Sequence, residues 1–227
     1  MFKIYKIFVL LFIISFSLPV DAHVQHYDDL KHIEFEIYRN DKHIGKHTFS
    51  FKKLDGQLAV ESEINFEIKK FGIVLYKYHV KGTEVYKDGK LIKFNSKTNQ
   101  NGKNKYVNLI LKDNEYVIDG SSYKGKAPTD FMLGTWWNHS IMKASAQISA
   151  VSGRIIKQKV TFLGKETIKF GEKNYNTLHF NFSSTDKKLD KGKKLNTHVW
   201  YEKKTLNWLK ASFKKKGKWE YKLVYMD

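Results

Sequence analysis

The 227-residue sequence contains no cysteine and only two prolines, Pro19 and Pro128. Without cysteine there can be no disulfide bond, thiolate metal site or thiol nucleophile, and no cysteine is available to carry a lipid. No linker rich in proline, glycine or serine separates the chain into parts. We therefore expect residues 23–227 to form one domain, which is long enough to build a core without disulfides.

The sequence also lacks any apolar run of the roughly 20 residues that a helix needs to span a bilayer. The longest run, residues 7–18, follows a basic start with Lys3 and Lys6 and precedes Val20-Asp21-Ala22. A short apolar run between a basic start and small residues is typical of a secretory signal peptide. We predict a signal peptide over residues 1–22 and an exported mature chain that begins at His23. That chain is periplasmic if the host has two membranes and otherwise secreted.

Arginine and acidic residues are few compared with lysine. The formal net charge is +18, and Arg39 and Arg154 are the only arginines. Such a charge favours contact with an anionic envelope surface, which we keep as a candidate partner. Proteins that bind phosphate groups specifically favour arginine, because its guanidinium group can donate two parallel hydrogen bonds to one phosphate. Since arginine is scarce here, we predict no specific nucleic-acid partner. The oligomeric state is left open.

The most frequent pattern in the sequence is an alternation of apolar and polar residues with a period of two. One set, Ile33, Phe35 and Ile37, precedes a turn, and Gly45 in the returning segment is typical of a bulge or close-packing point. The clearest alternation spans residues 58–68, and we predict that both sets share one core. The apolar members of the second set are Leu58, Val60, Ile64, Phe66 and Ile68.

The whole pattern indicates about thirteen antiparallel strands and a fold that is all-β with minor α content. A sheet of this size curls into a half-barrel or barrel. The alternation is lost over residues 124–147. Within them, Pro128-Thr129-Asp130 is typical of a helix start with Thr129 as its cap. We expect one or two short helices or a packed loop there, covering an open side of the sheet.

All five tryptophans lie in the second half of the sequence. Small barrels with an aromatic interior hold apolar ligands. We predict that Trp136, Trp137, Trp200 and Trp208 contact an apolar or amphipathic, lipid-like molecule, with nearby lysines meeting an anionic head group. The alternative is that these rings only fill the core, in which case the chain is a structural or interaction protein.

Three segments resemble a known group of proteins: the aromatic hairpin over residues 199–210, the opening hairpin over residues 35–51, and Trp136-Trp137-Asn138. They are similar to periplasmic lipoprotein carriers of the LolA/LolB-like type and to secreted bacterial families of unknown function near them. The resemblance implies a half-barrel around an apolar cavity, a helical cover and no catalytic activity.

Histidine offers a second alternative. Cleavage after Ala22 leaves His23 at the terminus, where its amine and imidazole can chelate copper with a second histidine, as in secreted copper mono-oxygenases. His43 and His47 lie about 13 Å apart on a predicted strand, too far to share an ion, and we interpret both as surface residues.

The sequence presents no catalytic constellation. Ser121-Ser122 and Ser183-Ser184 lack the glycine frame of a nucleophile elbow, and Glu61, Glu63 and Glu67 fit a solvated strand face. We therefore interpret the chain as a non-enzymatic binding protein and predict no catalytic residue, no cofactor and, apart from the copper alternative, no metal.

The first prediction concerns processing. Intact mass spectrometry of the protein isolated from its native host should find a chain that begins at His23, because residues 1–22 have the form of a cleaved signal. A mature chain that retains residues 8–18 would show instead that the segment is an anchor.

Overall fold

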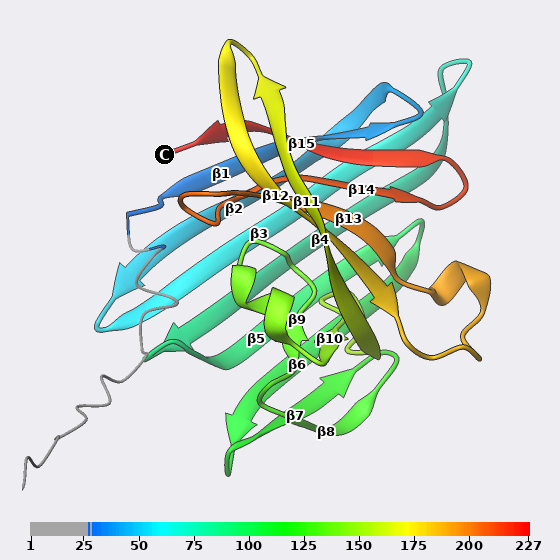
Figure 1. Cartoon of the computed structure of the whole chain (residues 1–227). Helices are drawn as coiled ribbons and strands as arrows, with labels where there is room; N and C mark the ends of the chain where they lie inside the picture. The colour runs from blue at the N-terminus through cyan, green and yellow to red at the C-terminus, as the bar shows by residue number, and fades with distance from the viewer. Residues whose placement is uncertain (1–26, 28) are drawn as a thin grey trace, which may run out of the picture.

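The computed structural model describes residues 27 and 29–227, so the signal peptide and His23 lie outside the described residues. The described chain forms fifteen strands in one large curled sheet (Figure 1). Within these residues no helix combines the length and apolarity required to cross a membrane. The predicted all-β class is confirmed, with two strands more than the thirteen expected.

The strands, in chain order, are β1 (His32–Arg39), β2 (Lys42–Leu54), β3 (Gln57–Lys70), β4 (Ile73–Lys87), β5 (Lys90–Gln100), β6 (Lys103–Lys112), β7 (Glu115–Gly120), β8 (Lys124–Pro128), β9 (Met132–Leu133), β10 (Ala146–Ile148), β11 (Ile155–Phe170), β12 (Lys173–Ser184), β13 (Asn196–Glu202), β14 (Trp208–Lys214) and β15 (Lys218–Met226). Two short 3-10 helices complete the described elements, η2 (His139–Lys143) and η3 (Lys191–Lys193).

The sheet is a meander whose two halves join where the chain begins and ends. Its order is β8-β7-β6-β5-β4-β3-β2-β1-β15-β14-β13-β12-β11-β10-β9, so the first strand pairs with the last. All pairs are antiparallel except β9 with β10. The edge strands β8 and β9 are not paired with each other, which makes the sheet open.

The core lies on the concave face of the curl. The predicted shared core is confirmed: Ile33, Phe35 and Ile37 are fully buried in the same cluster as Val60 and Phe66. Ile64 and Ile68 are partly buried and pack against that cluster. One strand face therefore supplies the apolar interior, and the alternating face carries the charges.

A bulge in β2 changes which residues face inward. Ile37 pairs with Gly45 whereas Tyr38 pairs with His43, which leaves Ile44 without a partner in β1. His43 and His47 consequently lie on opposite faces of the sheet. The prediction that His47 is a surface residue was wrong, because its side chain is only 5% exposed and points into the core.

The covering segment differs from its prediction in where the helix begins. No helix starts at Thr129, because residues up to Pro128 form the edge strand β8. The helical turn is η2, and the side chain of its cap, Asn138, accepts a hydrogen bond from the Ser140 amide at 3.0 Å. Trp137 and Ile141 are fully buried, so the segment packs into the sheet interior as expected.

The second prediction concerns Gly45. A Cβ at this position would lie 2.1 Å from the Asn65 carbonyl oxygen and 2.5 Å from the Phe66 Cβ on β3. Because strand backbones cannot yield as a flexible side chain can, Gly45→Ala should destabilise the fold by about 1–3 kcal/mol or more in urea unfolding. Gly192→Ala, which meets no atom within 4 Å, is the control. Equal midpoints for the two variants would contradict the close approach of β2 and β3.

Candidate functional site

A cavity of about 200 Å³ lies between the concave face of the sheet and the covering segment. The strands contribute His47, Ser62, Val80, Phe94 and Ser96, among others, and Ile156 contributes from β11. The cover contributes Gly134, Thr135, Gln147, Ser149, Ala150 and Val151, and none of the four predicted tryptophans is among the lining residues. Polar contacts hold this cover in place. Ser96 Oγ donates to the Ala150 carbonyl at 2.6 Å.

A buried glutamine pair fixes the other side of the cover. The Gln147 amide donates to Gln158 Oε1 at 2.7 Å, and Gln158 Nε2 in turn donates to the carbonyls of Ile141 and Ala144, each at 3.0 Å. Since both side chains are buried, each must find a partner inside the protein. The pair thus joins β10, β11 and η2 around the cavity.

His47 is the ionisable group on the cavity wall. Burial lowers the pKa of its imidazole to about 3, so the ring is neutral at physiological pH. Aromatic rings surround it, with centroids 4.3 Å away for Phe49 and 5.9 Å away for both Trp208 and Tyr221. Its Nδ1 has no hydrogen-bond partner among the described residues.

Trp136 and Trp208 lie beside this histidine. Trp208 stacks on Phe35 at 3.9 Å between ring centroids, and Trp136 meets Trp208 edge-on at 5.5 Å. Trp136 has φ 60°, a left-handed conformation that is an outlier for a bulky residue. The Tyr201 hydroxyl donates to the Trp136 carbonyl at 3.0 Å. Within the described chain neither indole Nε1 has a partner, although both atoms are buried.

Trp137 instead anchors the cover to the sheet. Its Nε1 donates to Glu84 Oε1 at 3.0 Å, and the Tyr86 hydroxyl donates to Glu84 Oε2 at 2.5 Å. Glu84 is fully buried, and this burial raises the pKa of its carboxyl group. Trp137 also meets Phe51 edge-on, so its whole indole is already in contact with protein atoms.

Trp200 lies on the opposite, convex face. Its ring stacks on His179 at 4.1 Å, and Lys210 Nζ lies 4.8 Å from the ring centroid. Its Nε1 donates to Glu166 Oε2 at 3.0 Å. The structure therefore gathers Trp136, Trp137 and Trp208 in the interior and separates Trp200 from them. Whether any of the four contacts a ligand stays a prediction.

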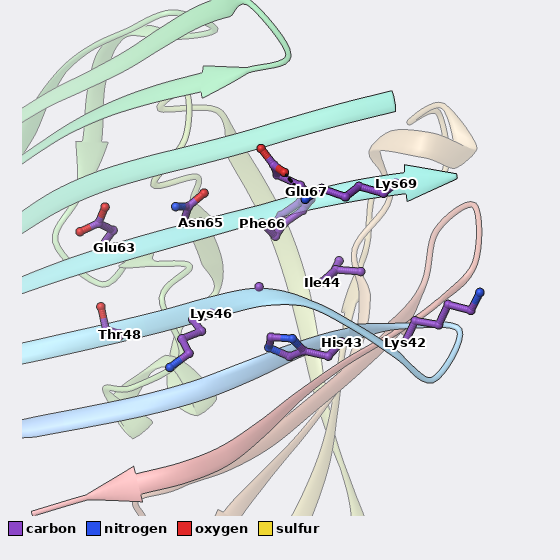
Figure 2. Close-up of a pocket in the computed structure, with 11 residues that line it drawn as sticks. Lys42, His43, Ile44, Lys46, Thr48, Glu63, Asn65, Phe66, Glu67 and Lys69 are labelled. Atoms are coloured by element: carbon purple, nitrogen blue, oxygen red, sulfur yellow. Dashed lines mark ion pairs between the residues drawn. The ribbon is translucent and has the colours of Figure 1, made fainter. Parts of the chain in front are cut away.

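A wider groove, of about 740 Å³, crosses the outer face of β2 and β3 beside the bulge. Figure 2 shows its charged side chains spread along the two strands. Its carboxylates are paired: Glu67 with Lys69 at 3.0 Å and Glu63 with His79 at 2.6 Å. This neutralised, open groove fits a solvated strand face.

The copper alternative has no support in the described residues. His23 lies outside them, and within them no three side chains of His, Cys, Asp or Glu are arranged to hold a metal ion.

Sequence reasoning missed the polar groups of the interior. Glu84 falls in the same period-two phase as Val80 and Tyr86, so a charged residue in an apolar phase was a detectable signal. His47 was missed although it shares the period-two phase of the buried Phe49 and Phe51, which was a detectable signal, and the bulge at Ile44 places His43 on the opposite face.

Comparison with known proteins gives the family. Residues 35–224 match the model of a domain of unknown function, DUF6134. The chain belongs to the DUF6134 family. No curated protein matches this DUF6134 sequence. The predicted membership in a family of unknown function is thus confirmed, whereas the resemblance to lipoprotein carriers stays a prediction.

One solved structure shares the architecture of this DUF6134 chain. It is the crystal structure of a β-barrel-like protein of the domain of unknown function DUF1849 from Brucella abortus. The TM-score is 0.59, with coverage of 87% of this chain and 97% of that chain. At 9% sequence identity the likeness concerns the fold alone, and it agrees with the curled antiparallel sheet.

The third prediction concerns Glu84. Because burial raises its pKa in the fold, the unfolded chain loses its proton first as the pH rises above the ordinary value of 4.5. The contribution of Glu84 to stability is therefore greatest below that pH and is lost as the pH rises toward the folded pKa. Glu84→Gln should gain stability relative to the parent between pH 5 and pH 8, measured by urea unfolding.

The matched control is Glu61→Gln on the outer face of β3, where the side chain is exposed and pairs with Lys52 at 3.2 Å. This variant should follow the pH profile of the parent. Parallel profiles for Glu84→Gln and the parent would mean that the buried carboxyl group does not resist ionisation.

Proposed function

We propose that this protein is an exported, non-enzymatic binding protein that holds an apolar or amphipathic small molecule inside its curled sheet. One observation carries the proposal: His47 Nδ1, Trp136 Nε1 and Trp208 Nε1 are buried, lack partners among the described residues, and belong to one cluster of rings. A buried polar group without a partner costs about 1–3 kcal/mol. A ligand oxygen that accepts from the two indole N–H groups would remove part of that cost.

The strained backbone at Trp136 supports the same proposal. A left-handed conformation at a non-glycine residue costs about 1–3 kcal/mol and is common at ligand clamps. Tyr201 stabilises this conformation through its hydrogen bond to the Trp136 carbonyl. This backbone conformation directs the two adjacent indoles to different partners. Trp137 donates a hydrogen bond to Glu84, and Trp136 packs edge-on against Trp208.

The cavity limits what can bind. Its volume of about 200 Å³ is smaller than the roughly 300–1,000 Å³ of common ligand pockets. It suits a short apolar chain with a single polar end, and a larger ligand requires the covering segment to move. The same small volume favours the second candidate, a structural or interaction protein with a filled core.

The fourth prediction tests binding with decanol, which has an apolar chain and one hydroxyl group that can accept from an indole N–H. Calorimetry and tryptophan emission should both report saturable binding. Trp136→Phe keeps an aromatic ring but removes the N–H, and it should weaken binding by roughly fivefold, the equivalent of one net hydrogen bond.

Trp200→Phe is the matched control, because the same substitution is made on the convex face and should leave the affinity unchanged. The unfolding midpoint of each variant is measured alongside. Equal affinities for the two variants would remove Trp136 from the site. An absence of saturable binding by the folded parent would favour the filled-core candidate.

A further inference from the structure

Three cationic residues lie in different elements: Lys105 on the inner face of β6, Arg154 directly before β11, and Lys215 in the turn between β14 and β15. On β5 the alternation that brings Phe94 and Ser96 to the cavity continues to Thr98, which pairs with Lys105 of β6. Arg154 lies two residues before Ile156, another residue of the cavity wall. Residues two apart on a strand share a face about 7 Å apart, so Thr98 and its partner Lys105 belong to the next layer of the interior, while Arg154 directly precedes β11.

Lys215 lies in the β14–β15 turn of the other half of the sheet, and it is exposed. It follows β14 in the inward phase of Ala211 and Phe213, and the Trp219 indole donates to its carbonyl at 2.8 Å. Partial desolvation lowers the pKa of the Lys215 ammonium group, and the charges of Arg154 and Lys105 lower it further. Lys105 of β6 and Arg154, which directly precedes β11, therefore both lie within electrostatic reach of Lys215.

These cations lack carboxylate partners in the described part of the chain. The contacts of Lys105 and Arg154 are to neutral oxygens, Gln100 Oε1 at 2.5 Å and the Lys193 carbonyl at 3.3 Å. The Thr98 hydroxyl beside them is 3% exposed and has no partner among the described residues. Converging like charges with a buried, unpartnered hydroxyl form an unfavourable arrangement that an anion would relieve.

We propose that Lys105, Arg154, Lys215 and the Thr98 hydroxyl bind the anionic head group of an amphipathic molecule whose apolar chain enters the cavity. This proposal rests on the proposed function and specifies its ligand class. The shared chemistry is an acyl or alkyl chain that ends in a carboxylate or a phosphate. The cationic side chains favour ligands with an anionic head group, and the cavity holds the apolar chain.

The test compares decanoate, decyl phosphate and decanol by calorimetry. Both anions should bind more tightly than decanol, and the preference should fall as salt is added. Lys105→Gln and Lys215→Gln should each weaken anion binding by roughly fivefold to tenfold, as expected for partly screened charges, while decanol binding stays unchanged. The stronger of the two anions identifies the head group as carboxylate or phosphate.

Lys97→Gln is the matched control, because Lys97 is exposed on the outer phase of β5 and pairs with Tyr106. Loss of repulsion should leave the Lys105 and Lys215 variants at least as stable as the parent. Equal affinities for decanol and the two anions would overturn the head-group site and leave the proposed function intact. An absence of binding by all three molecules would overturn both.

A second, independent feature lies at the tip of the β3–β4 hairpin. Residues 71–75 form an uninterrupted apolar stretch apart from one glycine, and Phe71 is 92% exposed, Ile73 67% and Leu75 54%. Consecutive exposed apolar residues oppose solubility and mark contact surfaces. No described residue covers them.

Basic residues surround this tip. Lys70 Nζ lies 5.4 Å from the Phe71 ring centroid. The β1–β2 and β14–β15 turns lie at the same end of the sheet, because Arg39 pairs with Trp219 and Lys218 donates its amide to Asn40. Apolar side chains among lysines complement an anionic lipid surface.

We infer that this end of the sheet docks on an anionic lipid bilayer, with Phe71, Ile73 and Leu75 entering its interface. Vesicle co-sedimentation tests it. The protein should bind vesicles that contain phosphatidylglycerol, in a salt-dependent way, more tightly than vesicles of phosphatidylcholine alone. The double variant Phe71→Ser and Leu75→Ser should lose at least tenfold in affinity for the anionic vesicles.

Leu54→Ser is the control, since Leu54 is 73% exposed at the opposite end of the sheet. It should bind like the parent. Equal vesicle binding by the double variant, or no preference for the anionic lipid, would overturn the docking surface. The result is independent of whether the cavity binds a ligand.

Discussion

The pairing of β1 with β15 is the contact on which the rest of the fold depends. It joins two meanders, β1–β8 and β9–β15, into one sheet, and it places the ends of the described chain beside each other in the middle. A continuous sheet of this width curls on itself, which brings the covering segment and the strands of the first meander together around the core. The concave face, the cover and the cavity all follow from that curl.

The curl creates an interior that apolar side chains do not fill alone. The covering segment enters it with Trp137, and Glu84 receives the indole N–H at the cost of burying a carboxyl group. The paired glutamines Gln147 and Gln158 satisfy each other and the carbonyls of η2. Where the interior polar groups have partners they fix the cover in one position. At His47, Trp136 and Trp208 the buried nitrogens have no partner among the described residues, and this is where the proposed function places the ligand.

Sequence reasoning captured what depends on local periodicity. The strands over residues 33–37 and 58–68, the close packing at Gly45 and the packed cover all follow from alternation and turn chemistry. The face of His47 also follows from its alternation with Phe49 and Phe51, whereas the opposite face of His43 depends on one bulged residue, Ile44, that no alternation predicts. The separation of Trp200 from the other tryptophans depends on strand phase, whereas the meeting of Trp136 with Trp208 depends on a long-range approach that no local pattern records.

The two faces of the sheet differ in how their charged side chains are paired, and the two ends differ in how much apolar surface they expose. Carboxylates and ammonium groups pair along the convex face, as Glu63 and Glu67 do. Lys105 on the concave face and Lys215 in the β14–β15 turn have no such partners among the described residues and lie at the end that also carries the β3–β4 tip. The proposed head-group site and the exposed apolar tip therefore lie at the same end of the sheet. The amphipathic molecule of the first proposal and the lipid layer of the second share the same order of apolar chain and anionic group, so on these proposals the head-group site and the tip select related partners.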